Sequence, residues 1–213
     1  MKHDGKPICY FDNRLKVDAI KLLPGQFYVT GSNKVLVTIL GSCVAACILD
    51  VEKQIGGMNH FMLPDTTISN DANMDTHTKY GISAMDTLIE ELVNAGARRD
   101  KLVAKVFGGG QVLPSFVQQD IGRVNAEFVL EYLKCVNISL VSSDLMSNYA
   151  RKIYFFPSSG SVYMKRIRDF HNATLHERET THRVLLTEQA KNHLMQTPQS
   201  EFTSNSTQYP LEP

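Results

Sequence analysis

A cysteine and a histidine are the two side chains in this sequence that best combine into a catalytic pair. Cys43 lies in residues 40–44 (LGSCV), and His60 follows seventeen residues later in residues 56–64 (GGMNHFMLP). A thiol on a Gly-Ser turn and an imidazole on a neighbouring apolar segment are the two parts of a nucleophile and its base. We therefore predict that Cys43 is a nucleophile activated by His60.

The turn that carries the cysteine also offers backbone hydrogen-bond donors. The N–H groups of Gly41, Ser42 and Cys43 are the natural donors for an oxyanion, because a tight turn can aim them at one point. Cys43 and Cys47 are four residues apart, but no Cys or His pair with ligand spacing accompanies them, so zinc is not expected. The predicted chemistry needs no metal and no organic cofactor.

Short apolar segments on either side of this turn are expected to position the pair. Residues 34–40 are β-branched and apolar and predict a buried strand that is broken by Gly41. Residues 44–49 predict a second strand or another buried segment, because periodicity does not decide its type. Residues 55–62 predict a third strand, which is ended by a proline. Such a cluster of strands would bring Cys43 and His60 to neighbouring ends.

The rest of the chain predicts an α/β fold. We expect helices over 80–96 and 121–136, because their apolar residues recur at helical spacing. Strands are predicted at 102–107, leading into three glycines, and at 138–141, and a hairpin over 152–156 and 161–167. The fold class is a single α/β domain with mixed, largely antiparallel sheets flanked by helices.

The ends of the chain and one internal segment differ in composition from this domain. We predict an N-terminal extension at 1–33 with one short strand at 27–30, a domain at 34–168, a helical C-terminal extension at 169–195 and a disordered tail at 196–213. Residues 65–79 are polar and are predicted to form a loop.

Composition excludes some classes of partner. The chain has 213 residues, with 22 Lys plus Arg and 22 Asp plus Glu, so nothing in its net charge favours nucleic acid or an anionic membrane. Its apolar runs are too short to span a bilayer, and its four cysteines are too few for a disulfide scaffold. We expect a cytoplasmic monomer that is not inserted in a membrane.

Five motifs in sequence order give the chain a specific resemblance to the bacterial CheD family. They are residues 40–45 (LGSCVA), 57–64 (GMNHFMLP), 105–109 (KVFGG), 121–125 (IGRVN) and 151–157 (RKIYFFP), and the resemblance covers residues 25–168. It implies a fold related to the cysteine deamidases of bacterial toxins. It also implies an activity, the deamidation of selected Gln side chains on the cytoplasmic helices of methyl-accepting chemoreceptors.

The resemblance also implies roles for individual residues. The nucleophilic cysteine and the histidine of the family fall on Cys43 and His60, and the third catalytic residue, a threonine, falls on Thr38. Gly41, Ser42, Asn59, Phe107, Gly108 and Gly109 complete the predicted substrate and oxyanion site. Where the family often has Asp-Leu-Gly-Gly, residues 144–147 read DLMS, which affects substrate preference or a partner surface more than the reaction.

Two other functions are open from the sequence. The family associates with CheC-type chemotaxis phosphatases, so the chain could serve as an adaptor between such a partner and the receptors. The same thiol could also hydrolyse glutamyl methyl esters on receptors, because thioester chemistry accepts either acyl donor. The products separate these functions, since amides release ammonia and esters release methanol.

Overall fold

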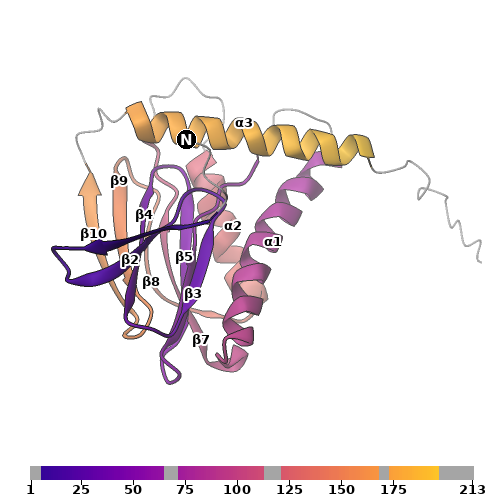
Figure 1. Cartoon of the computed structure of the whole chain (residues 1–213). Helices are drawn as coiled ribbons and strands as arrows, with labels where there is room; N and C mark the ends of the chain where they lie inside the picture. The colour runs from indigo at the N-terminus through magenta and orange to yellow at the C-terminus, as the bar shows by residue number, and fades with distance from the viewer. Residues whose placement is uncertain (1–5, 65–71, 113–120, 168–172, 197–213) are drawn as a thin grey trace, which may run out of the picture.

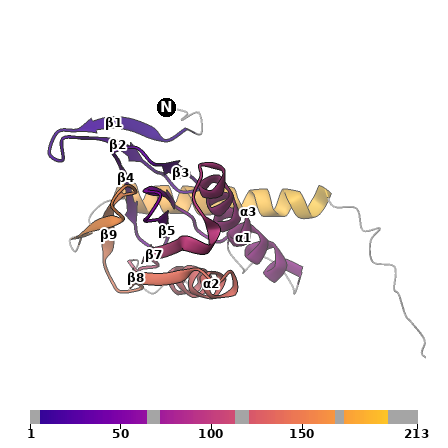
Figure 2. The ribbon, with the colours of Figure 1, turned by 90° about the horizontal axis from the view of Figure 1, so that it is seen from below.

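The chain folds into two stacked β-sheets with helices on one face and across one end. The structure is a computed structural model that describes residues 6–64, 72–112, 121–167 and 173–196. One sheet has the strand order β1-β2-β4-β9-β10 and the other has the order β3-β6-β5-β7-β8. The helices α1 (Ala72–Asn94) and α2 (Ile121–Cys135) cover the second sheet, and α3 (Ala173–Gln196) lies across one end of the sheets in both views (Figures 1 and 2).

Most strand pairs are antiparallel, as expected for this α/β arrangement. Only the pairs β2–β4 and β7–β8 are parallel among the strands of the described residues. The strands are β1 (Ile8–Asp12), β2 (Val17–Lys21), β3 (Phe27–Thr30), β4 (Lys34–Leu40), β5 (Val44–Asp50), β6 (Ile55–Asn59), β7 (Leu102–Gly108), β8 (Ser139–Leu145), β9 (Ala150–Phe156) and β10 (Ser161–Ile167).

Two apolar layers hold the sheets and helices together. Strand β5 is buried at all seven positions, because one of its faces packs on the other sheet and the opposite face packs on α1 and α2. Its alternate residues divide between these layers: Ala45 and Cys47 join the layer between the sheets, and Ala46 and Ile48 join the layer under the helices. A strand covered on both faces reads as a continuous apolar run, which is why the sequence predicted it.

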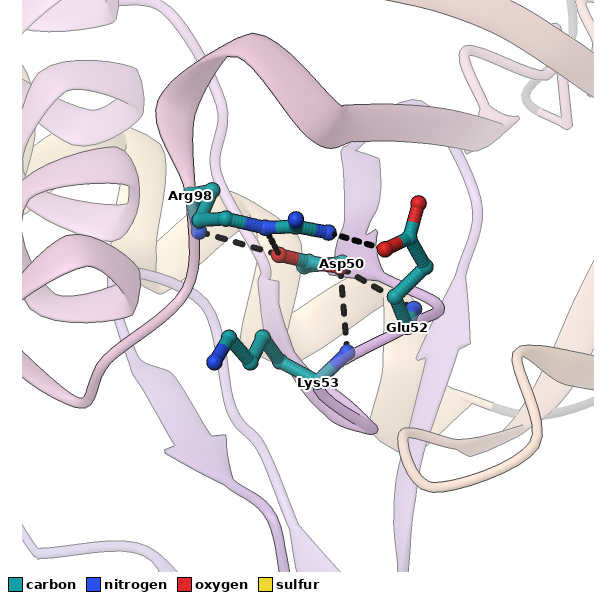
Figure 3. A network of polar contacts seen from close by, with 4 residues as sticks. All are labelled: Asp50, Glu52, Lys53 and Arg98. Carbon is teal, nitrogen blue, oxygen red and sulfur yellow. Dashed lines mark hydrogen bonds and ion pairs between the residues drawn. The ribbon is translucent and has the colours of Figure 1, made fainter.

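A polar network fixes the end of β5 that lies far from the Gly-Ser-Cys turn (Figure 3). The buried carboxylate of Asp50 accepts hydrogen bonds from the N–H groups of Glu52, Lys53 and Arg98 and from Nε of Arg98, at 3.0 to 3.2 Å. Burial opposes ionisation of Asp50, but these hydrogen bonds outweigh it and lower its pKa to about 2. The network ties the β5–β6 turn to the segment that precedes β7.

Two predicted elements differ from the structure. In the predicted N-terminal extension, residues 6–33 as described contain three strands, of which only β3 was predicted. Strand β2 pairs in parallel with β4, so this segment is part of the sheet. Strand β1 is an exposed edge strand, and such a strand has no alternation of buried residues for a sequence pattern to reveal.

The predicted loop at 65–79 is also corrected. Helix α1 begins at Ala72 instead of Tyr80, because a helical end with few apolar residues lacks the periodicity that signals a helix. Residues 65–71 and the predicted disordered tail after Gln196 lie outside the described residues. The predicted C-terminal helix is present as α3. No helix within the described ranges is long and apolar enough to cross a bilayer.

Candidate active site

Cys43 and His60 lie on neighbouring strand ends, on the same face of the sheet. Strand β4 ends at Leu40 and β5 begins at Val44, so residues 41–43 form the connecting turn. Val44 and Phe61 exchange both backbone hydrogen bonds at 2.9 Å. The residues that precede them, Cys43 and His60, therefore both point away from the helices and into the layer between the two sheets.

Thr38 reaches the same layer from the other sheet. On β4, Leu36 and Leu40 belong to the core between the sheets, and Thr38 alternates with them on that face. Its Oγ1 lies 2.7 Å from Nδ1 of His60 and donates to the carbonyl oxygen of Leu22 at 2.9 Å. The structure thus places the three predicted catalytic residues in the layer between the sheets, with Thr38 against the imidazole.

These contacts define which nitrogen of His60 carries the proton. The hydroxyl of Thr38 has one hydrogen, and the carbonyl of Leu22 can only accept, so that hydrogen is used there. Nδ1 of His60 must therefore donate to Thr38, which leaves Nε2 with a free lone pair. Nε2 is buried and has no hydrogen-bond partner among the described residues. Burial, with a smaller contribution from His182, lowers the pKa of His60 to about 3, so the imidazole is neutral at pH 7.

Gly108, Gly109 and Gly110 form a loop, the glycine loop, that contacts the turn of residues 41–43. The N–H groups of Gly109 and Gly110 donate to the carbonyls of Cys43 and Gly41, at 2.8 and 2.7 Å. Gly108 has a φ of 118°, and a Cβ there would lie 2.1 Å from the carbonyl oxygen of Cys43. The predicted residues Gly108 and Gly109 are therefore at the site, but they support the turn through their backbone.

Asn125 on α2 completes this support and was not predicted to have a role. Its Nδ2 donates to the carbonyl of Ser42 at 2.9 Å, and its Oδ1 accepts from the N–H of Leu63 at 2.8 Å. With the glycine loop, it binds all three carbonyls of the turn on one side. The N–H groups of Gly41 and Ser42 meet at a single carboxylate, so they can also be aimed at an oxyanion.

A carboxylate from α3 occupies those two N–H groups. Glu179 accepts hydrogen bonds from the N–H of Gly41 at 2.9 Å, the N–H of Ser42 at 3.1 Å and the hydroxyl of Ser42 at 2.7 Å. Burial and then the negative charge and hydrogen bond of Glu179 raise the pKa of the Cys43 thiol well above its usual value. In this state the cysteine is a neutral, fully buried thiol.

Gly41 leaves the space that this carboxylate fills. A Cβ at position 41 would lie 2.8 and 2.9 Å from the two carboxylate oxygens of Glu179 and 2.9 Å from Cγ2 of Val112. Contacts of this length between a methyl group and its neighbours require movement of one partner. The glycine is thus needed for any carboxyl or carboxamide group to approach these donors closely.

The side chain of Asn59, predicted to be part of the substrate and oxyanion site, makes its hydrogen bonds on the helix side of its strand. Its Oδ1 accepts from the N–H of Ala46 at 2.9 Å, and its Nδ2 donates to the carbonyl of Ala84 and to Sδ of Met85. Asn59 points toward α1 because it alternates with His60 on the strand. Together with His60, Asn59 borders a pocket of about 200 Å³ under α1.

Phe107, which was also predicted to line the site, is buried in the same apolar layer as Cys43.

A buried arginine near the start of β9 joins the glycine loop to the β8–β9 turn. Arg151 donates to the carbonyls of Gly108 and Met146, and its Nε lies 2.9 Å from a carboxylate oxygen of Asp144. Met146 and Ser147 have φ of 61° and 71°, the left-handed region that favours glycine. These are the positions where the resemblance leads one to expect Gly-Gly, so the turn keeps that backbone shape without glycine.

The site as a whole defines a class of protein. A cysteine thiol, a neutral imidazole with a free nitrogen and two neighbouring backbone N–H groups are the groups that a thiol-dependent acyl-transfer site requires. No group of three His, Cys, Asp or Glu side chains in the described ranges is placed to hold a metal ion. The thiol, the imidazole and the backbone donors are typical of α/β proteins with a cysteine–histidine site that hydrolyses an amide or an ester.

Comparison with known proteins identifies the family. Residues 62–166 match the family described as "CheD chemotactic sensory transduction". The "Probable chemoreceptor glutamine deamidase CheD 1" of Dechloromonas aromatica is 49% identical over 177 residues, which are 83% of this chain and 87% of the relative. The protein of the same name in Shewanella oneidensis is 45% identical over 179 residues, 84% of this chain and 87% of the relative.

A third relative, the "Probable chemoreceptor glutamine deamidase CheD" of Janthinobacterium sp., is 48% identical over 170 residues, 80% of this chain and 84% of the relative. The chain belongs to the CheD family, as its sequence motifs predicted. The family match begins just after His60, but the alignments of 177 and 179 residues are long enough to include Cys43 and His60 wherever they begin.

Proposed function

We propose that this chain deamidates selected glutamine side chains on the cytoplasmic helices of chemoreceptors, converting them to glutamate. The observation that carries the proposal is the hydrogen bond between Thr38 and Nδ1 of His60, which leaves Nε2 free in the layer that holds the Cys43 thiol. Relatives with that printed activity, at 45–49% identity over most of the chain, support it.

The geometry supports a two-step reaction. Nε2 of His60 takes the proton of Cys43, and the sulfur attacks the side-chain carboxamide carbon of the glutamine. The N–H groups of Gly41 and Ser42 stabilise the negative oxygen that forms. The carbon–nitrogen bond breaks, and ammonia leaves with a proton from His60. Water then hydrolyses the thioester, which gives glutamate and restores the thiol.

Each residue of the proposed site has a separate task. Thr38 orients His60, and its neutral hydroxyl strengthens the base less than a carboxylate would. Gly109, Gly110 and Asn125 hold the turn so that its N–H groups remain aligned. Phe107 forms part of the apolar wall beside Cys43. The proposed location of the enzyme is the cytoplasm, where the receptor helices lie, and a CheC-type phosphatase is a proposed partner.

Mass spectrometry of a receptor cytoplasmic fragment tests this function. The fragment is incubated with the protein or with Cys43→Ala, and its peptides are searched for conversion of Gln to Glu. We expect conversion at particular positions with the parent protein and none with the variant. Release of methanol from methylated receptor without conversion of Gln would assign the esterase activity instead, and binding without any conversion would assign the adaptor function.

A further inference from the structure

Helix α3 presents three residues of one face to the active site. Glu179 lies on the oxyanion donors, His182 lies near Gly25 and His60, and Leu186 is buried in the apolar layer that contains Cys43. A Cβ at Gly25 would lie 3.0 Å from Cε1 of His182. Spacings of three and four residues place these side chains in a row along the helix.

The group that α3 places in the site is the product group of the proposed reaction. Glutamine deamidation replaces the NH₂ of a carboxamide with an oxygen and gives a glutamate. Glu179 is such a glutamate, it is carried on a helix, and its two oxygens lie on the N–H groups of Gly41 and Ser42. The side chain therefore has the chemistry, the length and the helical setting of a deamidated substrate.

We propose that α3 occupies the substrate-binding surface as an intramolecular product analogue, so that a substrate helix must displace it and must place its glutamine where Glu179 lies. This inference rests on the proposed function and extends it to the regulation of the site and to its substrate geometry. A substrate helix would lie along the path of α3, with the residues three and seven positions after its glutamine facing Gly25 and the apolar layer.

The charges at the site agree with an unreactive, covered state. Glu179 disfavours a negative charge on Cys43, and His182 disfavours a positive charge on His60. Both effects of α3 oppose the thiolate–imidazolium pair that precedes attack. A neutral carboxamide in place of the carboxylate would remove the first effect, so a substrate bound there would add no negative charge that raises the pKa of the thiol further.

The contacts of α3 are also of the kind that a competing helix can replace. Glu179 is 5% exposed, and no ion pair joins it to a described residue; its hydrogen bonds come from uncharged donors. A buried carboxylate without a cation loses much of its hydration free energy. The single acceptor oxygen of a glutamine side chain can replace one of the two carboxylate oxygens, with a smaller desolvation cost.

A single substitution turns the product analogue into a substrate. In Glu179→Gln, the sulfur of Cys43 would attack the carboxamide carbon of Gln at 179, ammonia would leave, and water would release the thiol. The purified full-length variant should therefore carry Glu at position 179, read from the mass of peptides that span it. The double variant with Cys43→Ala should keep Gln. Glu177 lies two residues away and is exposed, so Glu177→Gln should also keep Gln.

A second experiment measures the rate at which the receptor fragment is deamidated. Glu179→Ala removes the carboxylate from the oxyanion donors, and we expect it to deamidate the fragment about tenfold faster than the parent, a typical size for coupling between two binding events. Glu177→Ala should match the parent. Gln retained at 179, together with unchanged receptor turnover in Glu179→Ala, would overturn the inference and leave the proposed function intact.

The two proposals fail in different ways. If neither the receptor fragment nor Gln at 179 is converted by any variant with Cys43, both the deamidase function and the inference are wrong. If Gln at 179 is converted and the receptor is not, the inference and the chemistry hold, and the proposed substrate is wrong.

Discussion

The hydroxyl of Thr38 accepts a hydrogen bond from Nδ1 of His60 and gives its own hydrogen to the carbonyl of Leu22, at 2.7 and 2.9 Å. The direction of both bonds follows from the carbonyl, which can only accept. A neutral residue thereby does what a carboxylate does in many hydrolases: it fixes the tautomer and the orientation of the base.

Thr38→Ala should lower kcat and leave KM nearly unchanged, because Thr38 contacts His60 and not the substrate. We expect a loss of about fivefold, the value of one neutral hydrogen bond of about 1 kcal/mol. Thr38→Ser keeps the hydroxyl and should recover most of the activity. Steady-state deamidation of a receptor fragment gives both constants, and full activity in Thr38→Ala would remove Thr38 from the mechanism.

The Cys43 thiol should react with iodoacetamide only at high pH in the parent protein. Burial and Glu179 raise its pKa, so the thiolate fraction is small near neutral pH. Removal of the negative charge in Glu179→Ala lowers that pKa and should move the alkylation profile to lower pH. The exposed Cys9 and Cys135 are internal controls. Identical profiles for Cys43 in both proteins would show that Glu179 does not affect the thiol.

Asn125→Ala should destabilise the fold as well as the site. The substitution leaves the carbonyl of Ser42 and the N–H of Leu63 without their partner in a buried place, which costs about 2–3 kcal/mol. Urea denaturation measures the loss. Glu127 lies on the same helix and is 55% exposed, so Glu127→Ala should change the free energy of unfolding by less than about 0.5 kcal/mol. A similar effect of both substitutions would contradict the role of Asn125.

Asp50→Asn should lower stability at neutral pH and leave catalysis intact, because Asp50 lies at the end of β5 opposite the turn. We expect a loss of about 2 kcal/mol from the weakened charged hydrogen bonds. The folded-state pKa of Asp50 is lowered from 3.8 to about 2. The stability from its ionised form is therefore present above pH 3.8 and is lost as the pH falls toward 2.

Denaturation curves of the two proteins at several pH values check this. The difference in free energy of unfolding between the parent and Asp50→Asn should be constant near neutral pH and shrink below pH 3.8. A difference that stays constant down to pH 2 would mean that Asp50 is not the group that titrates.

The family and the central residues of the site could be predicted from the sequence because they lie in contiguous motifs. Cys43 and His60 are separated by two strands and one turn, so local patterns suffice to bring them together. Strand β4 was predicted with its bounds, which placed Thr38 on it. Its contact with His60 depends on the stacking of two sheets, which no local pattern specifies.

Asn125 and Glu179 were missed for different physical reasons. Asn125 stands in a recognised motif, but a polar residue on a helix is usually solvated, and only the packing of α2 shows that it is fully buried. Glu179 is 137 residues from Ser42 along the chain and lies in a charged segment. Nothing in such a segment distinguishes the one carboxylate that is buried from its exposed neighbours.

The absence of a side chain on Gly41 links two properties, the covering of the site by α3 and the binding of substrate. Under the proposed arrangement, the same few ångströms of free space admit both the cover and the substrate, so a methyl group at Gly41 would obstruct both at once. Substitutions in α3, by contrast, can change how firmly the site is covered without altering the turn. Evolution could therefore adjust the activity of the covered enzyme through its C-terminal helix and keep the chemistry of residues 41–43.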